Sequence, residues 1–404
     1  MNDPHFTAED ISPSCAPRLN TPKEAHIENI IPDGKHARAF GVITIVLFIG
    51  ILLSFLVNFG VSAYLGTEEL VDSYFDGEKH PGIFLADFSN TFYLSQKVQS
   101  NVKKIDYSLF GRLPTSDVLL GDDEFLFPVY DAEAGYSYVA DYLGASRPNG
   151  TELDLYYNGI TSLTAEYEKR DITVFFIIIP NSQTVYSEKM PEYMGDISGD
   201  TRLKLTTRYL RKRGVTNYLD LTDALIAAKS EGELYNNTED SLNSRGAYVA
   251  YRAALEHLPD DVLAGIAAVE LQENDFVKHT TAGKELARIA SLEDKIKNRT
   301  VSLSSDFVQK YDIHLKFDDY EMSSPKMQYK NDLPSYPRML LQYSSDWDRI
   351  IMTDYFSNTF GTVIYNLSSA PTKEMLNKDP TYAFCFIHEK DLHLLADGSL
   401  MPEK

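Results

Sequence analysis

The most constraining feature of this sequence is the run from Ile172 to Ile179, in which every residue is β-branched or aromatic. Such a short, continuous run is typical of a strand that is buried on both faces, as in parallel sheets covered by helices. Further strands are predicted over residues 215–219, 339–343 and 362–367, and a hairpin over residues 118–127. Helical spacing alternates with the strands over residues 160–170, 202–213, 222–229, 244–258 and 349–360. The alternation predicts a three-layer α/β sandwich with a mainly parallel sheet.

A second feature is the stretch from residue 39 to residue 65, which contains no charged side chain. About 20 apolar residues cross a bilayer as a helix, so this stretch is long enough with some tilt. Lys35 and Arg38 precede it, whereas acidic residues from Glu68 onward follow it. The positive-inside rule therefore predicts a single-pass anchor with a cytoplasmic N-terminus. A buried core helix and a signal peptide cleaved near residues 61–63 are the alternatives.

These features divide the chain into four predicted parts. Residues 1–38 contain several prolines and mixed charge, so we expect a disordered cytoplasmic tail. Residues 39–65 are the predicted transmembrane helix, and residues 66–110 a stalk with an entry helix. Residues 111–404 are the predicted extracytoplasmic domain. Its less regular part, at about residues 259–335, is expected to be an insertion.

Composition and missing motifs exclude several kinds of protein. The formal net charge of −21 repels phosphate backbones, so nucleic acid is not an expected partner. The two cysteines, Cys15 and Cys385, fall on opposite sides of the predicted membrane segment and are not expected to pair. The sequence has no His-Glu-x-x-His, paired-Cys, Walker or Gly-x-Gly-x-x-Gly pattern, so we predict no metal and no nucleotide cofactor.

The loop after the buried run is the first of three segments that resemble a known family. Residues 179–181, Ile-Pro-Asn, lead to Tyr186 and to Met190-Pro191. This order resembles the alginate O-acetyltransferase (AlgX/AlgJ-like) and DHHW families, which are similar to SGNH hydrolases. Residues 120–127 are similar to the Gly-x-x-x-Trp-Leu-Phe entry of those families. The resemblance covers about residues 105–370 and implies an SGNH-like fold; an ordinary strand-to-helix loop is the alternative at this segment.

The second segment ends in Gly246-Ala247-Tyr248 and resembles the family's Asp-x-His-Trp step before a helix. In the ungapped frame, Glu239 falls at the orienting Asp and Ser241 at the general-base His. A hydroxyl cannot accept the proton of a serine nucleophile near neutral pH, so the usual triad chemistry is missing here. The alternative is a solvated helix N-terminus capped by Asn243 or Ser244.

The third segment, residues 339–349, resembles the family's nucleophile step, an Asp-Ser pair after an apolar strand. An ungapped frame matches Asp346 to the family Asp and Trp347 to its Ser, whereas a short insertion makes Ser344 or Ser345 the nucleophile. The alternative is a Ser-rich strand end. The resemblance makes Asn181, Tyr186, Arg245, Tyr248 and Trp347 candidate ligand contacts, because aromatic rings and guanidinium groups suit sugar rings.

Two functions follow from this comparison. The first is a catalytically degenerate O-acetyltransferase relative that binds or scaffolds a cell-envelope polysaccharide, beside a membrane-bound O-acyltransferase. The second is an active O-acetyltransferase or acetylesterase with a relocated base. Among the histidines after the anchor, His279 is the candidate substitute base, because it lies near a Gly-Lys-Glu-Leu step similar to a family motif. An adhesion or sensor domain is a third alternative.

Overall fold

The computed structural model describes residues 115–305, 336–367 and 370–402, the strand at 326–330, and residues 48–50, 53, 104, 107, 108 and 113. The chain forms two compact units, residues 1–97 and 98–404. In the first unit, only residues 48–50 and 53 are described, and they are helical. Among the described residues, no helix has the length and apolar character needed to span a bilayer. Most of the predicted anchor at residues 39–65 lies outside the described residues.

A six-stranded sheet forms the centre of the second unit, in the order β6-β5-β12-β10-β11-β9. Its strands are β5 (Thr173–Ile179), β6 (Tyr218–Asp220), β9 (Lys326–Lys330), β10 (Arg338–Tyr343), β11 (Thr362–Leu367) and β12 (Tyr382–His388). The first five in this order are parallel, and β9 pairs antiparallel with β11 at the edge. The carboxyl ends of the parallel strands therefore meet at one edge, where α/β proteins place their sites.

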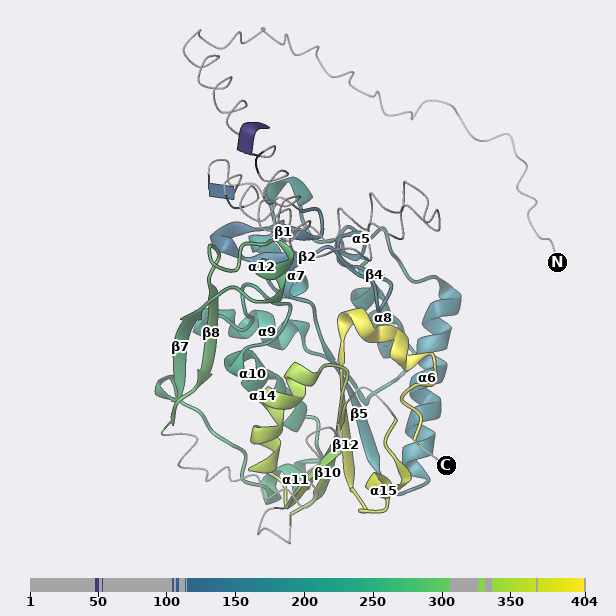
Figure 1. Cartoon of the computed structure of the whole chain (residues 1–404). Helices are drawn as coiled ribbons and strands as arrows, with labels where there is room; N and C mark the ends of the chain where they lie inside the picture. The colour runs from purple at the N-terminus through teal and green to yellow at the C-terminus, as the bar shows by residue number, and fades with distance from the viewer. Residues whose placement is uncertain are drawn as a thin grey trace, which may run out of the picture. The chain divides into compact units, whose positions relative to one another are not determined.

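Helices cover both faces of this sheet (Figure 1). Alternate residues of β5 point to opposite faces, so Phe175 and Ile177 join one core cluster whereas Phe176 and Ile178 join the other. The first cluster packs against α9 (Thr222–Ala228), α10 (Ser244–Leu255) and α14 (Asp346–Ser357). The second packs against α6 (Gly150–Glu168), α8 (Arg202–Lys212) and α15 (Lys373–Leu376). The predicted three-layer α/β sandwich with a mainly parallel sheet is confirmed.

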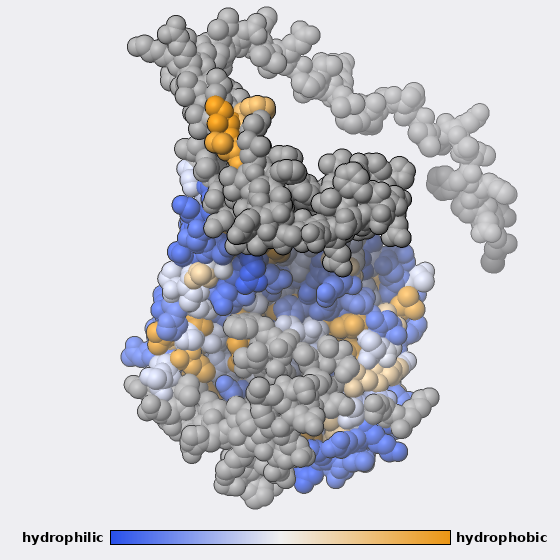
Figure 2. Space-filling model, viewed as in Figure 1, coloured by the Kyte–Doolittle hydropathy of each residue, from blue (hydrophilic) through white to orange (hydrophobic). Residues whose placement is uncertain are grey.

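Several smaller elements surround the central sheet. Strands β1 (Val118–Leu120) and β2 (Leu126–Pro128) form the predicted antiparallel hairpin, against which α12 (Glu285–Ile289) packs. A second hairpin joins β3 (Tyr130–Asp131) to β4 (Tyr136–Ser137), and α5 (Tyr138–Tyr142) follows it. A third hairpin joins β7 (Phe276–Thr281) to β8 (Asn298–Leu303), and α7 (Ser182–Val185) and α11 (Asp260–Gly265) complete the set of described α-helices. The described surface in Figure 2 is largely hydrophilic, with scattered hydrophobic residues.

One central strand was not among the sequence predictions. Strand β12 lies between β5 and β10 and pairs with both in parallel. All seven of its residues are buried, as expected for a strand in the middle of a sheet covered on both faces. Its run from Tyr382 to Ile387 is as apolar as β5, so the same signal was present in the sequence.

Candidate active site

A cavity of about 500 Å³ opens at the carboxyl ends of β10 and β12. Three sequence segments from distant parts of the chain meet there: the 239–241 loop before α10, the 344–345 step between β10 and α14, and the end of β12. The β3–β4 hairpin and α12 form its rim. The lining includes Tyr138, Glu239, Asp240, Ser241, Glu285, Ser344, Ser345, His388 and Lys390.

Ser345 and His388 are brought together by the pairing of their strands. Tyr343 of β10 is the register partner of Phe386 of β12, and their rings stack 5.4 Å apart. The Ser344 amide donates to the Phe386 carbonyl at 2.9 Å, and the His388 amide donates to Ser344 Oγ at 3.0 Å. Continuing the register by two residues places Ser345 opposite His388, on the face of the sheet that Tyr343 and Phe386 share.

Ser345 itself occupies the N-cap position of α14. Its backbone is extended, with φ −127° and ψ 134°, and its hydroxyl makes no capping hydrogen bond. The first backbone N–H groups of a helix have no acceptor within the helix, so they can bind an anion beside the N-cap residue. The Ser345 hydroxyl is not used to cap the helix, and the first backbone N–H groups of α14 lie next to it. This arrangement is typical of a serine nucleophile beside an oxyanion hole.

His388 forms a buried pair with Asp348. Its Nε2 bonds to Oδ2 of Asp348 in the first turn of α14, and the two side chains are almost fully buried. Burial acts to lower the pKa of His388, but Asp348, with smaller contributions from Asp391 and Asp240, raises it to about 9. The carboxylate therefore fixes the orientation of the ring and stabilises its protonated form.

The 239–241 loop contributes carboxylates and a hydroxyl. Ser241 Oγ accepts a hydrogen bond from Asn236 Nδ2 at 3.0 Å, and Asp240 Oδ1 accepts one from the Ser182 amide at 2.7 Å. Burial, followed by repulsion from Glu285, raises the pKa of Glu239, although Lys284 opposes this shift. The loop is thus fixed to its surroundings and brings negative charge to the cavity.

A buried polar network holds the end of β12 to the end of β5. Glu389 accepts hydrogen bonds from the Asn181 amide and from Thr184 Oγ1, both at 2.8 Å. Asn181 Nδ2 donates to the Tyr136 hydroxyl at 3.0 Å, and Tyr136 donates to Asp141 at 2.5 Å. Burial raises the pKa of Glu389 well above its ordinary range. Because Glu389 follows His388 directly, this network fixes the position of the histidine backbone.

The family assignment rests on a match over half of the chain. The family model described as an SGNH hydrolase-like domain of acetyltransferase AlgX matches residues 118–320 of the 404. This chain belongs to the AlgX family. No curated protein matches the sequence significantly.

Several solved structures resemble this AlgX-family chain. A DHHW family protein from Eubacterium siraeum has 12% identity and a TM-score of 0.47, with 72% of this chain and 98% of that chain covered. The O-acetyltransferase domain of Pseudomonas putida AlgJ has 14% identity and a TM-score of 0.39, with 68% and 91% covered. Bacillus cereus PatB1, solved with a sulfonyl adduct, has 14% identity and a TM-score of 0.44, with 72% and 99% covered.

Four of the six predicted catalytic positions of this AlgX-family chain meet in the cavity. Glu239, Ser241, Ser344 and Ser345 all line it, although they come from two segments about a hundred residues apart. The backbone of Asp346 begins α14, and its side chain lies outside the described ones. The fold therefore brings together two of the segments that the sequence comparison singled out.

The structure places His279, the predicted substitute base, outside this cavity. It lies on the exposed strand β7, where Nε2 is 2.7 Å from Ser302 Oγ of β8. The histidine in the cavity is His388, which the sequence analysis did not single out among the histidines after the predicted anchor. The signal that would have found it is its place directly after an apolar run, at the carboxyl end of a buried strand.

Four of the five predicted ligand contacts do not line the cavity. Asn181 and Tyr186 are buried, and the Tyr186 hydroxyl accepts a hydrogen bond from the Leu234 amide at 2.9 Å. Arg245 is buried against the Phe276 ring and forms an ion pair with Glu273. Tyr248 is half-buried, and its hydroxyl accepts from the Leu271 amide at 3.1 Å. For Trp347 the structure describes the backbone, in α14, and not the side chain.

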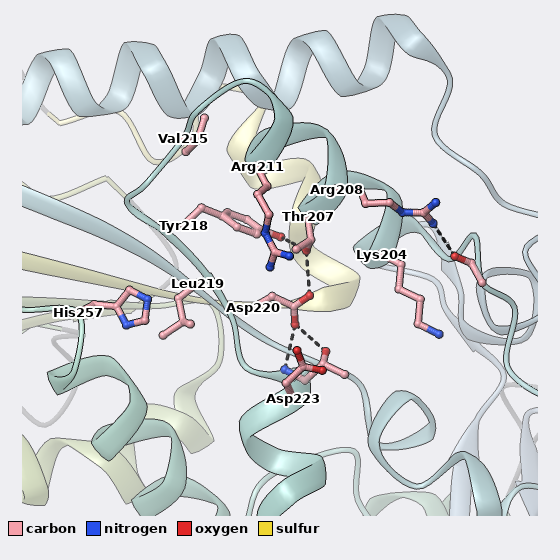
Figure 3. Close-up of a pocket in the computed structure, with 12 residues that line it drawn as sticks. Lys204, Thr207, Arg208, Arg211, Val215, Tyr218, Leu219, Asp220, Asp223 and His257 are labelled. Atoms are coloured by element: carbon pink, nitrogen blue, oxygen red, sulfur yellow. Dashed lines mark hydrogen bonds between the residues drawn. The ribbon is translucent and has the colours of Figure 1, made fainter.

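A second hollow, of about 480 Å³, lies beside the edge strand β6 (Figure 3). Lys204, Arg208 and Arg211 of α8 line it on one side, and His257 lies across from them. The hydroxyl groups of Thr207 and Thr222 both donate to the Asp220 carboxylate and not to a histidine. The cavity with Ser345 and His388 is therefore the better candidate active site of this AlgX-family chain.

Proposed function

We propose that this protein is a serine-dependent O-acetyltransferase or acetylesterase that acts on hydroxyl groups of a cell-envelope polysaccharide. The observation that carries the proposal is that Ser345 and His388 line one cavity at the ends of paired strands, with Asp348 bonded to the ring. Membership in the AlgX family supports ester chemistry on polysaccharides. It also supports the use of a serine at the step between β10 and α14.

In this mechanism, neutral His388 accepts the proton of Ser345 as the hydroxyl attacks the acetyl carbonyl. Asp348 holds Nε2, so Nδ1 is the nitrogen left to face the serine. Backbone N–H groups at the start of α14 stabilise the tetrahedral oxyanion. When the tetrahedral intermediate collapses, the bond between the acetyl carbon and the oxygen of the donor alcohol breaks. The imidazolium of His388 then gives its proton to the leaving alcohol. A sugar hydroxyl or water then attacks the acetyl-serine, giving transfer or hydrolysis.

Hydrolysis of p-nitrophenyl acetate by the purified full-length chain tests this function directly. Turnover is expected from the wild-type chain and not from Ser345→Ala. Labelling with a sulfonyl fluoride, followed by peptide mass spectrometry, is expected to place the adduct on Ser345. Wild-type turnover that persists in Ser345→Ala, or an adduct on a serine outside the cavity, would contradict the assignment of the nucleophile.

A second candidate function is glycan binding by a catalytically degenerate relative. It is favoured by Ser241, which stands where the family has a proton acceptor, and by the pKa of about 9 that keeps His388 protonated at neutral pH. This candidate predicts oligosaccharide binding by the wild-type chain without turnover at any pH between about 6 and 10. Isothermal titration beside the esterase assay separates the two functions.

The proposed location is the outer side of a membrane, with residues 39–65 as a single-pass anchor and a membrane-bound O-acyltransferase as the acetyl donor. The uncharged stretch and the charges that flank it support this location. Protease treatment of intact spheroplasts tests it: the main domain should be degraded, whereas an epitope at the N-terminus should be protected. An accessible N-terminal epitope would reverse the orientation.

A further inference from the structure

The cavity that holds Ser345 and His388 is lined by an excess of carboxylates. Six acidic side chains contribute to it: Asp117, Asp131, Glu133, Glu239, Asp240 and Glu285. Asp117, Glu133 and Glu285 are exposed at the rim, and Glu239 and Asp240 lie deeper and are half-buried. Among the described residues of the lining, only Lys390 and His388 bring positive charge.

Both of these cations are already paired with carboxylates. Lys390 Nζ lies 2.6 Å from Asp131 Oδ2, and His388 is bonded to Asp348. None of the other five lining carboxylates forms an ion pair with another described residue. Lys284 and Arg288 lie close enough to Glu239 to lower its pKa, but neither lines the cavity. The cavity is therefore strongly negative at the place where a substrate would sit.

The lining carboxylates also crowd one another. Burial raises the pKa of Glu239, and Glu285 adds to this shift although Lys284 and Arg288 oppose it, so the two lining carboxylates Glu239 and Glu285 repel each other. A cation between them would remove this repulsion, whereas a second anion would increase it. Charge of one sign in a partly enclosed cavity attracts substrates of the opposite sign and repels those of its own.

We infer that this cavity selects a substrate that carries an ammonium group beside the reacting hydroxyl, as in a glycan with unacetylated amino sugars, and disfavours polyuronates. The inference rests on the proposed function for the identity of the site and deepens it by naming the substrate class. The residues that carry it are the rim carboxylates, among which Glu133 and Glu285 are exposed.

Binding of three oligosaccharides of matched length tests the inference: a glucosamine oligomer, a neutral glucose oligomer and a galacturonate oligomer. At about pH 6 the amines of the first are largely protonated and the carboxylates of the third are ionised. Isothermal titration with the full-length chain is expected to give the tightest binding for the glucosamine oligomer, at least tenfold tighter than for the galacturonate oligomer. Equal affinities for the three would overturn the inference.

A double variant locates the effect in the cavity. Glu133→Lys with Glu285→Lys is expected to remove most of the preference for the glucosamine oligomer. Glu231→Lys with Glu256→Lys is the matched control, because both glutamates are exposed, neither lines the cavity and the change in net charge is the same. An equal loss of preference in both double variants would assign the effect to the overall charge of −21 and overturn the inference.

This result is separable from the test of catalysis. Turnover of the neutral ester p-nitrophenyl acetate without discrimination among the oligosaccharides would leave the proposed function standing and reject the substrate class. Discrimination in binding without turnover would reject catalysis and retain the substrate class for a binding protein.

Discussion

His388 at the end of β12 is bonded through Nε2 to Oδ2 of Asp348, in the first turn of α14, and both side chains are almost fully buried. The pair joins β12 to α14, and Ser345 lies directly before α14, in the step that connects this helix to β10. A buried carboxylate that holds one ring nitrogen determines both the tautomer and the orientation of the imidazole. Activity and its pH dependence should therefore depend on this pair.

Replacing Asp348 by Asn should abolish most of the activity while preserving the fold. The amide retains the size of the carboxylate but no longer stabilises the imidazolium that forms during proton transfer. We expect kcat for ester hydrolysis to fall by about 10²–10⁴-fold. Asp354→Asn is the control, because Asp354 is a half-buried carboxylate of the same helix that does not line the cavity. Equal kcat values for the two variants would contradict a role for Asp348.

The pH dependence of activity follows from the pKa of His388. This pKa is raised from 6.5 to about 9, so the ring is protonated at neutral pH and cannot accept a proton. We therefore expect kcat/KM to increase with pH up to about 9 and then to level off. If kcat/KM levelled off near the ordinary histidine pKa of about 6.5, the pair with Asp348 would not determine the pKa of the catalytic histidine.

The same shift predicts how stability changes with pH. Because the folded-state pKa is above the unfolded value, the pair contributes its full stabilisation below about pH 6.5 and loses it as the pH rises through about 9. Urea unfolding of the wild-type chain across this interval should therefore show falling stability. In His388→Gln the decrease should be smaller, since that side chain does not titrate.

The two serines of the cavity should differ in their effect on turnover. Ser345→Ala removes the proposed nucleophile, so we expect hydrolysis to fall to the background rate. Ser344→Ala removes the acceptor of the His388 amide, a hydrogen bond of 3.0 Å. Such a bond contributes about 0.5–1.5 kcal/mol, so we expect a loss of stability of that size and a smaller loss of kcat. If Ser344→Ala were fully inactive and Ser345→Ala were not, Ser344 and not Ser345 would be the nucleophile.

The layered fold could be predicted from the sequence because the buried strands leave local signals. β5 reads as a continuous apolar run, and the amphipathic spacing of α8 and α10 located both helices with small differences at their ends. The resemblance to SGNH-like families also singled out the 239–241 and 344–345 segments, and the structure shows that these two segments line one cavity.

The partner of Ser345 could not be predicted in the same way. The expected base position was Ser241, and no local pattern links His388 to Asp348, which lie 40 residues apart and meet only through the packing of α14 on β12. The buried state of Arg245 and Tyr186 is a second example. Both residue types are common in sugar-binding sites. In the structure, however, Arg245 forms an ion pair with Glu273, and the Tyr186 hydroxyl accepts a hydrogen bond from the Leu234 amide.

Helix α10 packs closely against the backbone at Leu234, and the contact point is Gly246. A Cβ atom added at Gly246 would lie 2.2 Å from the Leu234 carbonyl oxygen. That oxygen cannot move away freely, because it accepts the Asn243 amide at 2.8 Å. Gly246→Ala should therefore destabilise the domain by about 1–3 kcal/mol in urea unfolding.

Gly150→Ala is the matched control for this substitution. Gly150 also lies in the first turn of a helix, α6, but an added Cβ would meet nothing within 4 Å. The change should be neutral or stabilising by a few tenths of a kcal/mol, because alanine is the better helix former. Since Leu234 and Gly246 bracket the 239–241 loop, Gly246→Ala should also lower turnover, and Gly150→Ala should not. Equal stability of the two variants would show that α10 can shift away from Leu234.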